Sequence, residues 1–142
     1  MHTRTIATPL ILALALFLPV SAAKADETAI EKGVAAAEAW LTFVDRGEFD
    51  KSWENSATLF RNAVTQEQWR QKISAVRGPL GKRVWRKVIL TKYETALPGA
   101  PDGQYVIVQF KTVFENKANS VETVTPMKDP DGEWRVSGYL IK

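Results

Sequence analysis

Apolar residues in the first half of the chain recur every three or four positions, which is the spacing of one helix face. The first series predicts a helix that Gly47 ends, with an inward face of Ile30, Val34, Ala37, Leu41 and Val44. A shorter series predicts a second helix through Phe49, Trp53, Ala57 and Phe60. A third helix is predicted to face inward through Trp69, Ile73 and Val76 and to end at Gly78-Pro79.

Two capping boxes mark predicted helix starts. In each, a threonine is followed three residues later by Glu or Gln, as in Thr28 with Glu31 and Thr65 with Gln68. We therefore expect the first helix to begin near Thr28 and the third near Thr65.

The second half of the chain is rich in β-branched and aromatic residues. These predict strands over residues 83–93, 105–114, 120–127 and 134–141. The connections LPGAPDG, ENKAN and KDPDG resemble turns, so each strand is expected to pair antiparallel with the next. Helices before strands predict an α+β fold, with three N-terminal helices packed on one face of a curved four-stranded antiparallel sheet.

The N-terminal segment has the pattern of a secretory signal peptide. A charged start, MHTRT, precedes the apolar run IATPLILALALFLPV, and Ala23 and Ala25 occupy the small positions of a cleavage site. The apolar run is shorter than the ~20 residues that a membrane span needs. We expect a signal peptide over residues 1–25, a single domain over residues 26–142, and a periplasmic or secreted location.

Composition excludes several chemistries from the predicted mature chain. The sequence has no Cys, and its one His is His2, inside the predicted signal peptide. A Ser-His-Asp triad, a Cys nucleophile, a His base and a disulfide framework are therefore not expected. We predict no cofactor and no metal site, although carboxylates alone can bind calcium.

A basic run, WRQKISAVRGPLGKRVWRK, occupies residues 69–87. Nucleic acid is not an expected partner, because loss of Arg4 and Lys24 with the signal lowers the net charge from +3 to +1. Strand alternation predicts Arg83 and Lys87 on one face and Arg86 on the other. A solvated basic edge is the simpler interpretation. The alternative is weak contact with an anionic envelope surface such as phospholipid or lipopolysaccharide headgroups.

One row across the predicted sheet carries the main candidate site. Centring the hairpins on their turns places Val88 opposite Phe110, Phe110 opposite Val124, and Val124 opposite Val136. The same register aligns four residues on the face toward the helices, namely Arg86, Thr112, Glu122 and Gly138. The row is either an ion pair across the sheet with both partners satisfied or the charged floor of a ligand pocket. Both interpretations depend on the register, because a slip of one residue would turn Glu122 to the other face. We favour the ion pair.

Other candidates are weaker. Asp45 ends the first predicted helix, where an acid is electrostatically unfavourable, and a local ion pair with Arg46 or another base would explain it. Trp134 is one of five tryptophans that either line a cleft or fill the core. The predicted outer face of the sheet carries an aromatic group that a partner or a sheet-to-sheet homodimer would cover, formed by Trp85, Tyr93, Tyr105 and Tyr139.

Four segments resemble a family of secreted bacterial proteins catalogued as domain of unknown function 4019. They are AWLTFVDRGEFDKSW, RGPLGKRVWR, LPGAPDGQYVIVQF and DGEWRVSGY, and the resemblance extends from about Ala36 to Tyr139. The order of elements is similar to the nuclear transport factor 2-like (cystatin-like) superfamily. That resemblance implies a fold shared by enzymes, such as ketosteroid isomerases, and by binding modules, so it transfers no catalytic residue.

We therefore expect a small secreted binding or accessory domain that is not catalytic. It would bind a small amphipathic ligand in a helix–sheet cavity or an envelope protein on the open sheet. The alternative is a carboxylate-dependent enzyme, isomerase- or hydrolase-like, with Glu122 or Asp45 as base in the same cavity. The identity of the ligand and the oligomeric state stay open.

Overall fold

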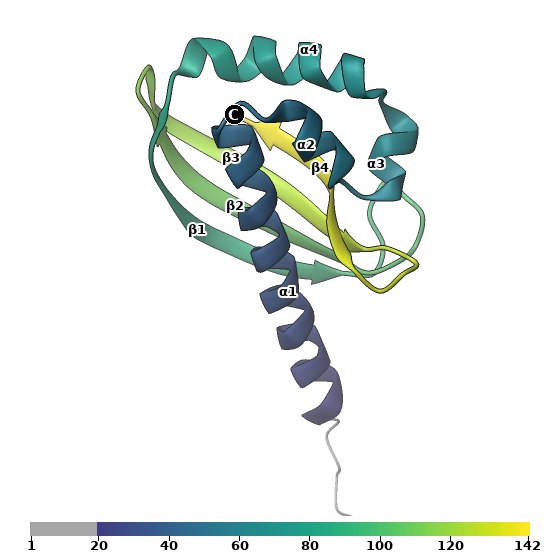
Figure 1. Ribbon diagram of the computed structural model, residues 1–142. Coiled ribbons are helices and arrows are strands. Elements are labelled where there is room, and N and C mark those ends of the chain that lie inside the picture. The colour runs from purple at the N-terminus through teal and green to yellow at the C-terminus, as the bar shows by residue number, and fades with distance from the viewer. Residues whose placement is uncertain (1–19) are drawn as a thin grey trace, which may run out of the picture.

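The computed structural model describes residues 20–142 and shows helices packed against one face of a curved sheet (Figure 1). The helices are α1 (Val20–Asp45), α2 (Phe49–Glu54), α3 (Thr58–Ala63), α4 (Gln66–Arg77) and the short 3-10 helix η1 (Gly78–Leu80). The strands are β1 (Arg83–Glu94), β2 (Tyr105–Phe114), β3 (Lys117–Lys128) and β4 (Trp134–Ile141). They form one antiparallel meander in the order β1-β2-β3-β4, which confirms the predicted α+β class.

The N-terminal region departs from the prediction at the start of the first helix. α1 begins at Val20, and the Thr28 hydroxyl donates to the Lys24 carbonyl at 3.0 Å instead of capping the helix. The predicted signal peptide falls largely on residues 1–19, outside the described residues, and stays a prediction. Within residues 20–142, none of the helices has the length and apolar character to cross a membrane.

The predicted second helix is divided into α2 and α3. Residues 55–57 leave the helix because Ser56 forms a parallel bridge with Val136 of β4, and the Ala57 amide donates to the Val136 carbonyl at 2.8 Å. Asp129, from the β3–β4 connection, accepts the Thr58 amide at the start of α3. The predicted capping box at Thr65 and Gln68 is confirmed at the start of α4.

The core lies between α1 and the face of the sheet that α1 covers, called the inner face below. α1 contributes Ala37, Trp40, Leu41 and Val44, and the sheet contributes Val106, Val108, Phe110, Val124 and Val136. Gly33 permits the close approach of α1 to β2, since a Cβ at this position would lie 2.6 Å from the Val106 Cβ. Trp40 and Trp69 belong to this core, and both indole N–H groups donate to Ser52 atoms at 2.9 Å.

Three of the four register shifts in the sheet are β-bulges that set which residues of β1 and β4 face the core. Val84 and Ile89 are extra residues in β1 relative to β2, and Ser137 is an extra residue in β4 relative to β3. Each bulge reverses the alternation of the residues that follow it. The prediction that Arg83 and Arg86 face opposite ways is therefore wrong, because the Val84 bulge places both on the inner face.

The predicted register is correct only in part. Val88 pairs with Phe110 as expected, but Phe110 pairs with Glu122 and not with Val124. That shift of two residues keeps Glu122 on the inner face. Across β3 and β4, Val124 pairs with Tyr139 and not with Val136, because the Ser137 bulge shifts β4 by an odd number of residues.

Candidate functional site

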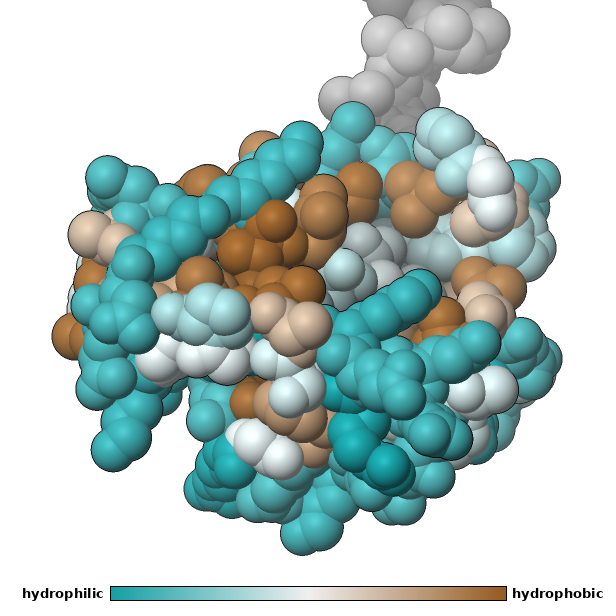
Figure 2. Space-filling view, turned by 90° about the horizontal axis from the view of Figure 1, so that it is seen from above, coloured by the Kyte–Doolittle hydropathy of each residue, from teal (hydrophilic) through white to brown (hydrophobic). Residues whose placement is uncertain are grey.

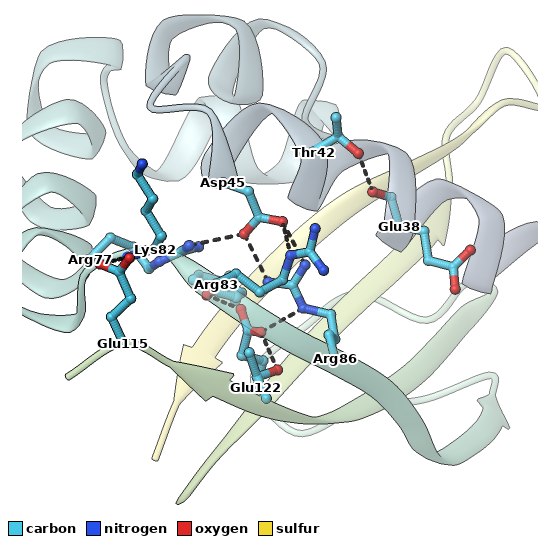
Figure 3. Close-up of polar contacts among 11 residues, drawn as sticks. Glu38, Thr42, Asp45, Arg77, Lys82, Arg83, Arg86, Glu115 and Glu122 are labelled. Atoms are coloured by element: carbon cyan, nitrogen blue, oxygen red, sulfur yellow. Dashed lines mark hydrogen bonds and ion pairs between the residues drawn. The ribbon is translucent and has the colours of Figure 1, made fainter. Parts of the chain in front are cut away.

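The centre of the candidate site is the carboxylate of Asp45, the last residue of α1 (Figure 3). Its Oδ1 accepts from Nη2 of Arg77 at 2.9 Å and from Nη2 of Arg86 at 2.9 Å. Its Oδ2 accepts from Nη1 of Arg86 at 2.7 Å and from Nε of Arg83 at 3.1 Å. One carboxylate thus holds three guanidinium groups, and we call these four residues the Asp45 cluster.

Two separate elements deliver these arginines to the end of α1. Arg77 is the last residue of α4, and Arg83 and Arg86 come from the start of β1. They lie 32, 38 and 41 residues beyond Asp45 in the sequence. The sequence shows an acid in an unfavourable position, which a local pair with Arg46 or another base was expected to explain. Arg77 was not among the predicted site residues, because nothing local relates the ends of two helices that are far apart in the chain.

Glu122 of β3 extends the cluster into the core. Its side chain is fully buried, and its Oε1 accepts from Nε of Arg86 at 2.8 Å. The hydroxyl of Thr112 donates to the same oxygen, and the hydroxyl of Tyr139 donates to Oε2. The structure therefore brings together Arg86, Thr112 and Glu122, three of the four residues in the predicted row.

The fourth member of that row, Gly138, does not reach the site. The Ser137 bulge turns Gly138 to the outer face opposite Thr125, where a Cβ would contact the Thr125 side chain. Tyr139 takes the inner position instead. The predicted gap beside Glu122 is thus filled by a phenol that binds the carboxylate.

Burial and charge act in opposite directions on the pKa values of Asp45 and Arg86, and in the same direction on that of Tyr139. Burial alone would raise the pKa of the Asp45 carboxyl, but hydrogen bonds and positive charge from Arg86 and Arg77 outweigh it, so the pKa is lowered. Burial would lower the pKa of Arg86, but Asp45 and Glu122 raise it above its usual value. Burial and the Glu122 carboxylate together raise the pKa of Tyr139. Asp45 and Arg86 are therefore held charged and Tyr139 neutral.

Arg77 is the least satisfied member of the cluster. Its side chain is buried, and its guanidinium carbon lies 4.7 Å from the centre of the Phe114 ring. Its Nε and Nη1 have no hydrogen-bond partner within residues 20–142. Three guanidinium groups face two carboxylates, Asp45 and Glu122, which gives this region an excess of one positive charge.

A pocket of about 230 Å³ opens beside the cluster. It is lined by Glu38, Leu41, Thr42, Asp45, Arg83, Arg86, Lys87, Val88 and Phe110. Arg83 is the most accessible arginine of the cluster, with 41% of its side chain exposed, whereas Glu122 is not among the lining residues. A molecule in this pocket would meet Arg83 and Arg86 together with the carboxylates of Glu38 and Asp45, and not the Glu122 carboxylate.

The secondary candidates occupy other places. Trp134 is half-buried and lines a separate pocket of about 280 Å³ between α1 and β4. Trp85 is exposed on the outer face of the sheet, as predicted. The predicted aromatic outer face is wrong for Tyr93 and Tyr139, which face inward. Tyr105 lies on the outer side of β2, opposite to the inner Val106, but it is buried and not exposed.

A different contact or bulge sets the position of each of the three tyrosines. Tyr93 faces inward and packs against the core, because the Ile89 bulge reverses the alternation of β1. Tyr105 is buried, and its hydroxyl donates to the Pro101 carbonyl at 2.6 Å in the β1–β2 connection. Tyr139 faces inward to Glu122.

The molecule has one further apolar hollow of interest. In the view from above, apolar surface gathers in a hollow that hydrophilic side chains surround (Figure 2). Between α4 and the end of β4, a groove of about 220 Å³ is lined by Trp69, Lys72, Ile73, Val76, Tyr139, Leu140 and Ile141.

Within residues 20–142, no three carboxylate side chains gather as they would around a metal ion.

The comparison with protein families matches the chain to the family described as Protein of unknown function (DUF4019), over residues 36–139. None of the curated proteins compared matches the chain. The matched region contains the Asp45 cluster, Thr112, Glu122 and Tyr139. It covers most of the chain, and the predicted family resemblance is confirmed: the protein belongs to the family of unknown function DUF4019.

Proposed function

We propose that this protein is a non-catalytic binding domain for a small amphipathic anion, which it binds in the pocket beside the Asp45 cluster. The observation that carries the proposal is an excess guanidinium charge at the base of an open pocket with an apolar wall. Fixed guanidinium groups bind carboxylates and phosphates in a defined geometry, and little side-chain freedom is lost on binding.

Arg83 is the residue that the ligand would contact first. Within residues 20–142 it makes a side-chain hydrogen bond only through Nε, to Asp45, so its two terminal nitrogens remain for an anion. Lys87 and Glu38 line the same pocket with opposite charges, so the charged lining of three bases and two acids keeps an excess of one positive charge. Each of the three nitrogens of Arg86 already donates to Asp45 or Glu122, so Arg86 contributes its positive charge to the pocket from a fixed position.

The size and lining of the pocket limit the rest of the ligand. Leu41, Val88 and Phe110 supply apolar contact beside the charged groups. The volume of about 230 Å³ is below the ~300–1,000 Å³ of typical small-molecule sites. The favoured ligand is therefore a short alkyl chain with a single carboxylate or phosphate.

The carboxylate-dependent enzyme is less well supported. A general base needs a pKa near the working pH, and the pKa of Asp45 is lowered by its arginines. Glu122 is buried beneath Arg86, Thr112 and Tyr139, all of which donate to it. A partner or homodimer on the aromatic outer face also loses support, since Tyr93 and Tyr139 face inward and Tyr105 is buried.

The test is a titration of the full chain with hexanoate, with hexanol as the neutral probe, followed by NMR. We expect hexanoate to shift resonances of Arg83 and Val88, and Arg83→Gln to weaken binding about tenfold or more, as for loss of a charge-assisted hydrogen bond. Arg70→Gln is the matched control, because Arg70 also pairs with a carboxylate, Asp50, but outside the pocket. Equal binding of hexanol, or unchanged hexanoate affinity in Arg83→Gln, would overturn the proposal.

A further inference from the structure

β1 exposes an unusual amount of apolar surface for an edge strand. Within residues 20–142, five of the seven exposed large apolar side chains belong to it. They are between 37% and 62% exposed and comprise Val84, Trp85, Val88, Ile89 and Leu90. Val88 lines the pocket of the Asp45 cluster, and the other four lie along the edge strand. Exposed apolar side chains gathered on one strand indicate a contact surface.

The same strand is strongly basic. No acidic residue occurs between Trp69 and Tyr93. On the outer face, Lys87 pairs directly with Lys111 of β2, and the Lys87 ammonium lies 5.6 Å from the centre of the Trp85 ring. Like charges directly opposite each other destabilise a sheet. An anionic partner at this position would relieve that repulsion, so charge complementarity identifies the chemistry of the partner.

The backbone of β1 argues against an extended peptide as that partner. A peptide that adds to a sheet needs a regular edge, and β1 is interrupted by bulges at Val84 and Ile89. A lipid surface needs no backbone register. It is recognised by aliphatic and Trp side chains at the interface together with Lys or Arg near the headgroups, which is the composition of this strand.

We propose that β1 and Lys111 form a docking surface for an anionic lipid bilayer. Val84, Trp85, Ile89 and Leu90 would enter the headgroup region, and Lys87 and Lys111 would contact phosphate groups. The pocket of the Asp45 cluster opens next to this surface, since Arg83, Lys87 and Val88 of β1 line it. The docking surface is inferred independently of the ligand in that pocket.

The experiment is co-sedimentation of the full chain with vesicles of phosphatidylcholine alone, or with phosphatidylglycerol in equal parts. The apolar N-terminal segment is present in every variant, so differences between variants report on β1. We expect binding to the anionic vesicles to weaken about tenfold in Lys87→Gln/Lys111→Gln and to fall as salt is raised. Trp85→Ser and Ile89→Ser/Leu90→Ser should also reduce it.

Matched controls separate the surface from general effects of charge or apolar character. Lys72→Gln/Lys128→Gln removes two exposed charges away from β1, and Val76→Ser/Leu140→Ser removes two half-exposed apolar side chains. Both should bind as the unmodified chain does, and circular dichroism checks that every variant is folded. The proposal is overturned if the β1 variants bind like these controls. The proposal is also overturned if the chain binds vesicles of phosphatidylcholine alone as tightly as the anionic vesicles.

Discussion

Arg83 and Arg86 lie three residues apart on β1, yet both donate to the same oxygen, Oδ2 of Asp45, at 3.1 Å and 2.7 Å. Two residues at this spacing point to opposite faces of a regular strand. The bulge at Val84 removes that restriction. The C-terminal end of α1 is therefore tied to the edge strand by one carboxylate, and the same contact shapes the pocket.

Removing the charge of Glu122 is expected to be costly. Glu122→Gln leaves the half-buried Arg86 guanidinium without one of its two carboxylates, so we expect a loss of about 3 kcal/mol in the free energy of unfolding. The pair should also be coupled: Arg86→Met with Glu122→Leu should cost at least ~1 kcal/mol less than the two single changes together. Urea denaturation measures both. Arg70→Met with Asp50→Leu, an exposed pair, should show a coupling near zero.

The stability of the protein should depend on the ionisation of Asp45. Its pKa is lowered in the folded state, so its contribution is present above the unfolded value of about 4 and is lost as the pH falls through the folded value. Asp45→Asn should be less stable than the unmodified chain at pH 7, and this difference should shrink below about pH 4. Parallel stability curves for the two proteins across that range would contradict the assignment.

Two tyrosine hydroxyls offer a matched comparison. Tyr139 donates to the buried Glu122 carboxylate, and Tyr105 donates to a backbone carbonyl. Because hydrogen bonds to charged groups are stronger, Tyr139→Phe should lower the free energy of unfolding by about 1.5–3 kcal/mol and Tyr105→Phe by about 0.5–1.5 kcal/mol. Thermal and urea unfolding of both variants test the order, and a larger loss for Tyr105→Phe would disagree with it.

The packing of α1 on β2 can be tested at Gly33. Alanine is usually favoured over glycine in a helix by about 1 kcal/mol. At Gly33, however, the new Cβ would lie 2.6 Å from the Val106 Cβ, so we expect Gly33→Ala to destabilise the fold by about 1–3 kcal/mol. Gly78 has helical dihedral angles and no atom within 4 Å of its added Cβ. Gly78→Ala should be neutral or slightly stabilising, and equal effects at both positions would refute the close approach.

Local patterns in the sequence were sufficient for the elements that depend on neighbouring residues. Apolar spacing and the Thr65 capping box located α4, and alternation located β2 and β4 at the bounds that the structure shows. The division between α2 and α3 was not predictable in this way. It depends on the pairing of Ser56 with Val136, a residue of the last strand.

The features of the candidate site also fall into those that the sequence predicts and those that depend on the tertiary structure. The sequence alone determined the order of helices and strands, the absence of Cys, and a sheet that could bring Arg86 near Glu122. Only the tertiary structure decided that Arg77 and Arg83 join Asp45, and that Tyr139 replaces Gly138 beside Glu122. The physical reason is that a bulge of one residue reverses every side chain after it, and its position is set by how distant segments pack.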